Sequence, residues 1–228
     1  MSSRLRALDE GLWVVDHPLV VGGLHLGTRS TVVQLTGGGV VVHSPGPLDP
    51  GLAEELEKLG PVRALIAPNR LHHLSLAGAG RAFPAARVFG APGLAAKQPD
   101  LHLDEELGDE PPELWKTDLT QHCFGGAPRL SEVVFHHPAS RSLLLTDLAF
   151  HVLHSDSRLT RVAMWLNDGY GRFGPTRLLR RTIRDRAAAR ASLELVLSWD
   201  FERVIVTHGE VLESGGREAL RAAYAWLE

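Results

Sequence analysis

Short apolar runs, each ended by a turn or a polar residue, constrain this fold more than any other feature. The runs over 62–67 and 203–207 are almost wholly apolar, which is typical of strands covered on both faces. A helical pattern over 49–59 lies between an apolar run that ends at residue 43 and the run 62–67, because leucines recur there at helical spacing and an aspartate and a proline suit the helix start. This alternation predicts an α/β layered fold rather than an all-β barrel.

Two hairpins are predicted in addition to these elements. β-Branched runs over 30–35 and 40–43 flank a cluster of three glycines, and apolar runs over 131–136 and 142–147 flank a short polar turn. We expect further helices over 74–83, 187–197 and 217–227. The acidic stretch over 100–112 is expected to be an exposed connection, so that residues 1–228 form one domain.

The composition excludes several classes of protein. Hydrophobic residues make up 44% of the 228, and the formal charge of −3 shows no basic excess for nucleic acid or an anionic membrane. The arginines over 158–190 belong to a chain of net charge −3 and lack the aromatic interleaving of a base-stacking platform, so they are interpreted as a solvated helix face. No apolar run is long enough to span a membrane, and the polar N-terminus does not resemble a signal peptide, so we expect a cytoplasmic protein. The single cysteine excludes an internal disulfide.

Twelve histidines are a high number for this length, and two of them are adjacent. His72 and His73 follow the apolar run 62–67, at the kind of strand end where ligand sites of α/β sheets collect. Asp147 and His208 end two other apolar runs. Imidazole and carboxylate groups on rigid strand ends are the ligands that zinc prefers, which predicts a metal site there.

The same segments carry a resemblance to a known family. The phrases "VVVHSPGPL", "VRALIAPNRLHHL", "SEVVFHHPASRSLLLTDLAF" and "WDFERVIVTHG" are similar to the uncharacterised DUF4336-type family of the metallo-β-lactamase superfamily. The resemblance runs from about Leu12 to about Gly209. It implies a four-layer αββα sandwich and a metal-activated hydroxide that attacks a carbonyl, phosphoryl or related electrophile.

The sequence departs from the superfamily pattern at the second motif. Fully active members carry H-x-H-x-D-H there, whereas this chain has Pro68, Arg70, His72 and His73 at the four positions. By the resemblance, His73 would join Asp147 and His208 around one ion. His72 would add or replace a ligand. The expected metal ligands are therefore His72, His73, Asp147 and His208, with Asp147 and His72 as the catalytic residues.

These features predict a metal-dependent, hydrolase-like protein with one zinc-type ion. Another divalent metal is an alternative to zinc. The expected substrate is a small molecule that the sequence does not identify. The first alternative is a degenerate member that keeps the fold as a binding or scaffold protein without turnover. A second alternative is a redox or non-haem iron protein, against which the broken histidine set argues. The sequence does not predict an oligomeric state.

Four further histidines have no assigned role. His136 and His137 alternate along a predicted strand, so they point to opposite faces and cannot both enter one cleft. His43 begins the phrase His43-Ser44-Pro45-Gly46, which stands where active relatives carry an aspartate in an "IDTG"-like phrase, and His122 is the imidazole nearest to the place of the third motif.

Overall fold

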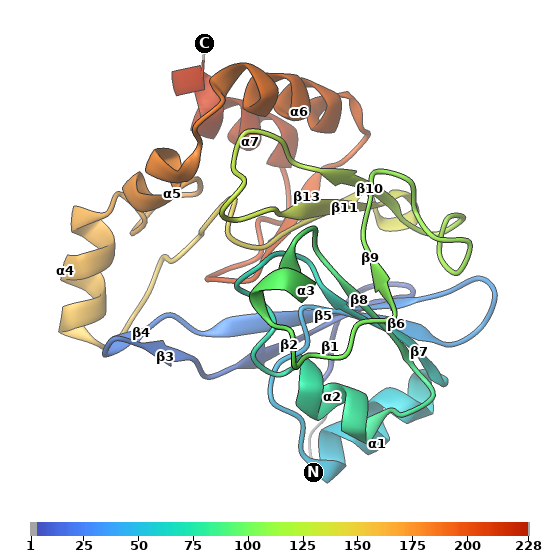
Figure 1. The fold of residues 1–228 in the computed structure, drawn as a ribbon. Coiled ribbons are helices and arrows are strands. Elements are labelled where there is room, and N and C mark those ends of the chain that lie inside the picture. The colour runs from blue at the N-terminus through green and yellow to red at the C-terminus, as the bar shows by residue number, and fades with distance from the viewer. Residues whose placement is uncertain (1–3, 228) are drawn as a thin grey trace.

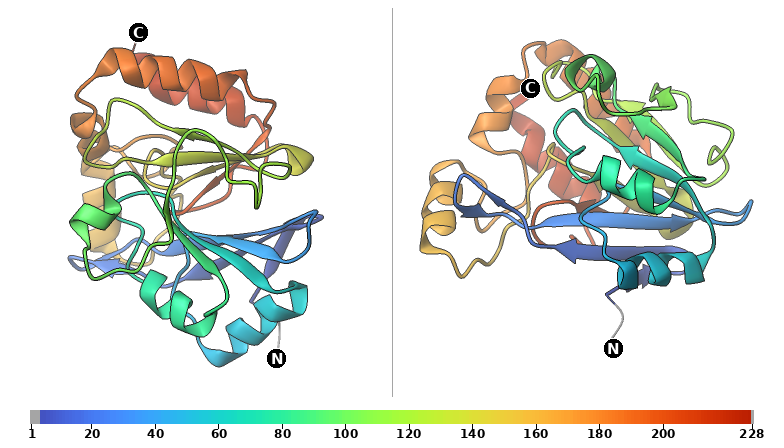
Figure 2. Two further views of the ribbon diagram at one scale, coloured as in Figure 1. Left: turned by 45° about the vertical axis from the view of Figure 1, so that its right-hand side comes forward. Right: turned by 60° about the horizontal axis from the view of Figure 1, so that its bottom comes forward.

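The computed structural model describes residues 4–227, so Met1 to Ser3 of the N-terminus interpreted above, and the last residue of the predicted domain, lie outside the described residues. Two sheets face each other and carry helices on their outer sides (Figure 1). The left view of Figure 2 shows the resulting sequence of helix, sheet, sheet and helix layers. This is the predicted αββα arrangement.

The first sheet has seven strands in the order β1-β2-β5-β6-β7-β8-β9. Its strands are β1 (Arg6–Asp9), β2 (Leu12–His17), β5 (Thr28–Gln34), β6 (Val40–His43), β7 (Val62–Ala67), β8 (Arg87–Gly90) and β9 (Glu105–Glu106). The predicted hairpin is confirmed, because β5 pairs antiparallel with β6. The acidic connection differs from the prediction in one respect, since its backbone adds the two-residue strand β9 to the exposed edge beside β8. A separate ribbon consists of β3 (Val20–Val21) and β4 (Leu24–His25).

The second sheet has four strands in the order β10-β11-β12-β13. They are β10 (Thr120–Cys123), β11 (Val133–His137), β12 (Ser142–Leu145) and β13 (Arg203–Val206). The second predicted hairpin is confirmed by the antiparallel pairing of β11 with β12, and β12 then pairs parallel with β13.

The helices cover the outer faces as the apolar patterns require. α1 (Pro50–Leu59) begins after the Asp49 cap, whose carboxylate accepts a hydrogen bond from the Leu52 N–H, and it ends at Gly60. The others are α2 (Leu76–Ala82), α3 (Leu94–Lys97), α4 (Arg158–Leu166), α5 (Arg177–Thr182), α6 (Arg186–Ser198), α7 (Gly216–Tyr224) and the 3₁₀ turns η1 (Pro138–Ser140) and η2 (Ala225–Leu227). Among residues 4–227, no helix is long and apolar enough to cross a membrane.

Three apolar layers hold these elements together. One lies between α1, α2 and the first sheet, one lies between the two sheets, and one lies between the second sheet and α6 and α7. Phe89 and Trp115 meet edge to face in the middle layer at a ring-centroid distance of 4.6 Å. Because both sheets are covered on both faces, their apolar runs carry few polar groups until the strands end.

Candidate metal centre

Three side chains meet where strands of the two sheets end. The Nε2 atom of His72 lies 3.3 Å from an oxygen of Asp147 and 3.3 Å from Nε2 of His208. The Nε2 atom of His208 lies 3.6 Å from the other oxygen of Asp147. The three side chains are only 9%, 13% and 5% exposed, respectively. We call this set the three-residue cluster.

The topology explains why residues so distant in sequence meet. His72 follows β7, Asp147 follows β12 and His208 follows β13, and each strand delivers its residue from its carboxyl end. The turn after His208 needs Gly209, which has a φ of 100°, and a Cβ there would collide with the backbone of His151. We therefore expect any larger residue at position 209 to displace His208.

Hydrogen bonds at the far ring nitrogens orient both imidazoles. The Nδ1–H of His208 donates to the carbonyl of Gly27 at 2.7 Å, and since a carbonyl only accepts, Nε2 carries the lone pair in the neutral ring. The Nδ1 atom of His72 lies 2.9 Å from the hydroxyl of Ser44. Ser44 holds a left-handed φ of 53°, a strained backbone of the kind found at functional sites. Both Nε2 atoms thus point at Asp147, which is how outer partners orient metal-binding histidines.

Asn69 joins the His72 loop to the Asp147 strand end. Its side-chain oxygen accepts the backbone N–H groups of Leu71 and His72, both at 2.8 Å. Its side-chain nitrogen lies 2.8 Å from an oxygen of Asp147 and 3.1 Å from the carboxylate of Glu132. Because Asn69 is fully buried, these contacts hold both parts of the cluster in one geometry.

Glu132 is a second buried carboxylate beneath the cluster. It accepts backbone N–H groups from Thr146 at 2.7 Å, Asp147 at 2.8 Å and Leu148 at 3.2 Å. Burial and the nearby charge of Asp147 raise the pKa of Glu132, although hydrogen bonds from Thr146 and Asn69 oppose the shift. Glu132 therefore fixes the backbone from which Asp147 projects.

The cluster is electrostatically coupled. Burial opposes ionisation of both partners, but the charge of Asp147 and its hydrogen bond outweigh burial and raise the pKa of His72. For Asp147, burial is outweighed by the charge of His72 and by the interactions with His208 and His72, so that its pKa is lowered. The carboxylate is therefore ionised at neutral pH, and a proton on His72 competes with any metal ion for the same site.

The donor set fits a divalent metal ion. Ligand atoms at zinc bond lengths of 2.0 to 2.2 Å on a tetrahedron lie about 3.3 to 3.6 Å apart. The two Nε2 atoms of the cluster are 3.3 Å apart, each lies 3.3 or 3.6 Å from a different oxygen of Asp147, and one ligand atom of each residue lies within 4.8 Å of the others. Two imidazoles and one carboxylate are also a common ligand set for catalytic zinc and for non-haem iron. Among the described residues, this is the group whose donor atoms all lie within 4.8 Å of one another.

The structure does not bring His73 into the cluster. His72 takes the place that the resemblance gave to His73, because neighbouring residues of a turn point in different directions and only one of them can face the cleft. His73 is half-buried, and its pKa is lowered by burial and by the charges of Lys97 and His72. The expected convergence of His73 with Asp147 and His208 is therefore not observed, and our proposed ligand set omits His73.

Pro68 and Arg70 fix the loop instead of supplying imidazoles. The carbonyl of Pro68 accepts the Val133 N–H at 2.8 Å, and the Arg70 N–H donates to the carbonyl of Leu130 at 3.0 Å. These bonds attach the His72 loop to the segment that enters β11. The departure from the superfamily motif is thus accommodated by contacts between the two sheets.

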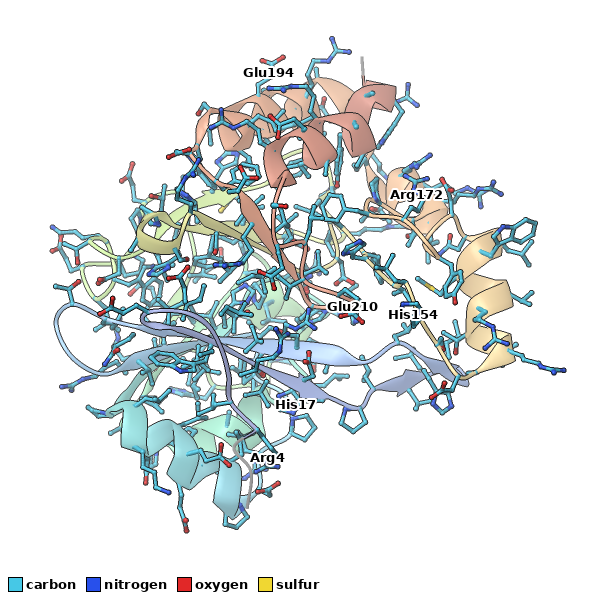
Figure 3. The ribbon with its side chains drawn as sticks, turned by 180° about the vertical axis from the view of Figure 1, so that it is seen from behind. Arg4, His17, His154, Arg172, Glu194 and Glu210 are labelled. Atoms are coloured by element: carbon cyan, nitrogen blue, oxygen red, sulfur yellow. The ribbon has the colours of Figure 1, made fainter. Side chains whose placement is uncertain are left out.

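The remaining histidines lie outside the cluster. His122 pairs with Asp109 at 2.8 Å, His136 stacks on Trp199 and His137 contacts Ser140. The last two lie on opposite faces of β11, as the alternation predicted. His43 is buried edge-on to Phe135, and among residues 4–227 neither of its ring nitrogens has a hydrogen-bond partner. Figure 3 shows from behind where His17 and His154 lie.

Sequence reasoning missed three groups that build the site. These groups are Asn69, Glu132 and Ser44, none of which is among the site residues expected from the sequence. The sequence does contain an indication of the role of Asn69, since a side-chain amide that lies close to two expected strand ends can form hydrogen bonds to both of them. No local pattern reveals that the carbonyl of Gly27 reaches His208, because 181 residues separate them.

Comparisons with known proteins agree with this architecture. A family model described as a domain of unknown function, DUF4336, matches residues 9–166. No curated protein matches the sequence. Solved structures of the metallo-β-lactamase fold match almost the whole chain.

Three of these structures illustrate the likeness. A metallo-β-lactamase from Pontibacter korlensis is 14% identical, with a TM-score of 0.67 and coverage of 98% of this chain and 97% of that one. The metallo-β-lactamase FIM-1 from Pseudomonas aeruginosa, in its mono-zinc form, is 15% identical, with a TM-score of 0.64 and coverage of 98% and 92%. The metal-soaked Flv1 flavodiiron core from Synechocystis sp. PCC6803 is 12% identical, with a TM-score of 0.65 and coverage of 98% and 60%. At these identities the likeness shows the fold.

Proposed function

The chain belongs to the DUF4336 family and has the metallo-β-lactamase fold, and on this basis we propose that it is a metal-dependent hydrolase-like protein with one zinc-type ion. The observation that carries the proposal is the convergence of His72, Asp147 and His208 at metal-ligand spacing. The mono-zinc form of FIM-1 supports it, because a related fold there holds a single zinc. A small molecule is the proposed substrate.

The chain's own residues would prepare the site for hydrolysis. A bound zinc-type ion supplies a Lewis acid that makes water nucleophilic near neutral pH. Gly27 and Ser44 hold His208 and His72 with their Nε2 atoms toward the ion. Asn69 bonds one oxygen of Asp147 and so orients the carboxylate, whose other oxygen lies 3.6 Å from Nε2 of His208.

Asp147 and His72 are the residues that we propose to contact the reacting groups. Asp147 is ionised and lines the pocket beside the cluster, so its carboxylate can accept a hydrogen bond from a water molecule there. Its lowered pKa makes it a weak base, and its proposed role is therefore to orient the water.

The first test is metal content. Protein purified without an affinity tag should contain about one equivalent of a divalent metal, measured by elemental mass spectrometry. Asp147→Ala and His208→Ala should each contain less than about a tenth of an equivalent after dialysis, because two remaining ligands hold an ion weakly. Wild-type protein without stoichiometric metal contradicts the proposal.

A paired substitution separates the adjacent histidines. His72→Ala should lose the metal, whereas His73→Ala should retain it, because only His72 has a ring nitrogen in the cluster. Both substitutions lie in the same turn, so each serves as a control for the other's effect on folding. Loss of metal in His73→Ala alone would reverse the assignment.

Turnover distinguishes the proposed hydrolase from a binding or scaffold protein. Metal-loaded protein is assayed with esters, lactones and phosphodiesters, and Asp147→Ala serves as the blank. Hydrolysis above the blank supports the enzyme. Stoichiometric metal without hydrolysis of any of these classes favours the binding protein. The sequence motivates this alternative, because Pro68 and Arg70 stand where fully active members carry imidazoles.

A further inference from the structure

A small apolar pocket adjoins the three-residue cluster. It has a volume of about 250 Å³, and Asp147 is one of its lining residues. Phe150 also lines it and stacks on the ring of His208, with centroids 5.0 Å apart and planes 14° apart. The pocket therefore opens beside two of the three proposed ligands.

The rest of its lining is mainly aliphatic. Leu130 and Leu179 are buried and form part of the core, whereas Leu71 and Leu178 remain 51% and 64% exposed. Large apolar side chains that are exposed to water beside a pocket favour the binding of an apolar ligand, because the ligand removes their surface from water. Arg129 also lines the pocket.

We propose that this pocket binds a short apolar group of the substrate, such as an alkyl or small acyl chain attached to the electrophilic centre. This inference rests on the proposed function, because it places the bond to be cleaved next to Asp147. A group in contact with Phe150 and Leu178 holds the adjoining electrophile at the cluster, since Phe150 contacts both the pocket and His208.

The volume limits the size of that group. At about 250 Å³ the pocket is smaller than the roughly 300 to 1,000 Å³ of sites for drug-sized ligands. A long lipid chain does not fit within it. The inferred substrates are therefore small esters, lactones or related compounds that carry a short apolar substituent.

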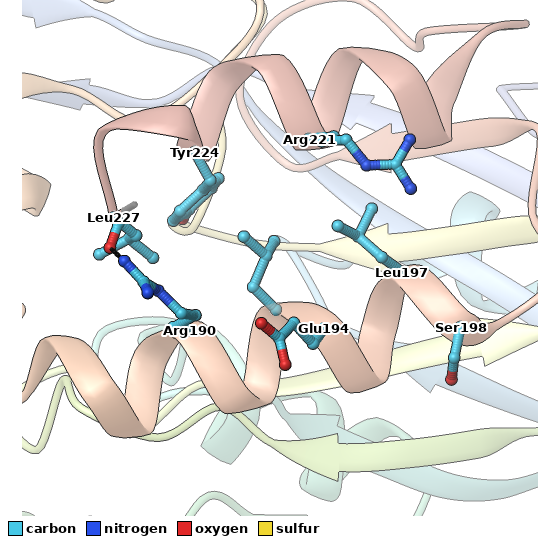
Figure 4. Close-up of a pocket in the computed structure, with 8 residues that line it drawn as sticks. Arg190, Glu194, Leu197, Ser198, Arg221, Tyr224 and Leu227 are labelled. Carbon is cyan, nitrogen blue, oxygen red and sulfur yellow. Dashed lines mark hydrogen bonds between the residues drawn. The ribbon is translucent and has the colours of Figure 1, made fainter.

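Another hollow, of about 400 Å³, lies between α6 and the C-terminal segment (Figure 4). Arg190, Glu194 and Arg221 line it, and Arg190 donates a hydrogen bond to the carbonyl of Leu227. None of its lining residues belongs to the three-residue cluster. Binding of an apolar ligand at this hollow would therefore indicate non-specific binding.

The test measures binding without turnover. Purified full-length protein is titrated with 1-propanol, 1-butanol, 1-pentanol and 1-hexanol, and backbone amide signals are followed by NMR. The signals of Leu130, Phe150 and Leu179 should move. The Kd should fall about fourfold for each added methylene, because each one removes a similar apolar area from water.

Two leucines provide a matched pair of variants. Leu178→Ser should weaken 1-hexanol binding by about fivefold or more, because it removes apolar lining. Leu159→Ser, on α4 and at 58% exposure, should leave the Kd unchanged, since Leu159 does not line the pocket. Both side chains are exposed, so neither variant should unfold. A Kd that is independent of chain length, or shifts confined to Glu194 and its neighbours, would overturn the inference.

The titration is repeated on chelator-treated protein to separate the two proposals. Alkanol binding needs no metal and should persist. Chain-length-dependent binding in a protein that never holds stoichiometric metal supports the pocket and overturns the proposed function. Stoichiometric metal without alkanol binding supports the proposed metal site and overturns the inference about the pocket.

Discussion

An Asn69→Ala variant is expected to lose metal affinity by about 10- to 100-fold and stability by about 3 kcal/mol or more. Asn69 touches no metal ion in the proposed site. It acts through its side-chain oxygen, which holds the His72 turn, and through its side-chain nitrogen, which holds Asp147. It is therefore a positioning residue.

The size of the effect follows from burial. Alanine leaves the part-buried backbone N–H groups of Leu71 and His72 without their acceptor and removes a donor from the carboxylates of Glu132 and Asp147. Each unsatisfied buried polar group costs about 1 to 3 kcal/mol, and more where the group is charged. Asn69→Asp should be worse still for metal-free protein, because it places a third carboxylate beside two that are buried.

Asn167 supplies a matched control, because it is the other asparagine of the chain and accepts one backbone hydrogen bond, from Leu178 at 2.9 Å. Asn167→Ala should cost about 1 kcal/mol and leave metal affinity unchanged. Urea unfolding of metal-free protein measures stability, and competition with a chromophoric chelator measures affinity. Equal metal affinity in Asn69→Ala and wild type would show that the cluster forms without Asn69.

The sequence predicted the layers because each buried strand is a local apolar run and each helix carries its own stripe. The run over 62–67 coincides with β7, and 49–59 matches α1 with its Asp49 cap. The second helix starts at Leu76 rather than at residue 74, because residues 72–75 form turns. Such boundaries depend on loop contacts that no local pattern records.

The site was only partly predictable for the same reason. Strand ends identified Asp147 and His208, since the last residue of a buried strand must face either core or cleft. The choice between His72 and His73 depends on the rotation of one turn. That rotation is fixed by Asn69 and by backbone bonds from Pro68 and Arg70 to the segment before β11, which are non-local.

His43 illustrates a buried group that sequence reasoning left without a role. It ends β6 on the same side of the strand as Val41, which lies in the layer between the sheets. Both its ring nitrogens are unpartnered, and burial, together with the charge of His72, lowers its pKa to about 3. The native protein therefore keeps this imidazole neutral at pH values at which the unfolded chain protonates it.

Acid should consequently destabilise the metal-free protein steeply. A histidine with a pKa near 6.5 when unfolded and about 3 when folded loses stability as the pH falls below 6.5, by about 2 kcal/mol between pH 7 and pH 5. Burial also lowers the pKa values of His17, His136 and His137, which adds to the loss. The raised pKa of His72 increases the free energy of unfolding as the pH falls, but only at pH values above 6.5. The lowered pKa of Asp147 decreases the free energy of unfolding only below about pH 4.

His43→Leu should remove this one component of the acid sensitivity. Leucine has a similar volume and no polar atoms, so at pH 7 the variant should be as stable as wild type or more stable, because no unpartnered nitrogen is buried. Between pH 7 and pH 5 it should lose about 2 kcal/mol less than wild type in urea unfolding. His154→Leu, at an exposed position, should follow wild type. An unchanged pH dependence in His43→Leu would mean that His43 takes up a proton in the native state, which would require a partner for its ring nitrogens.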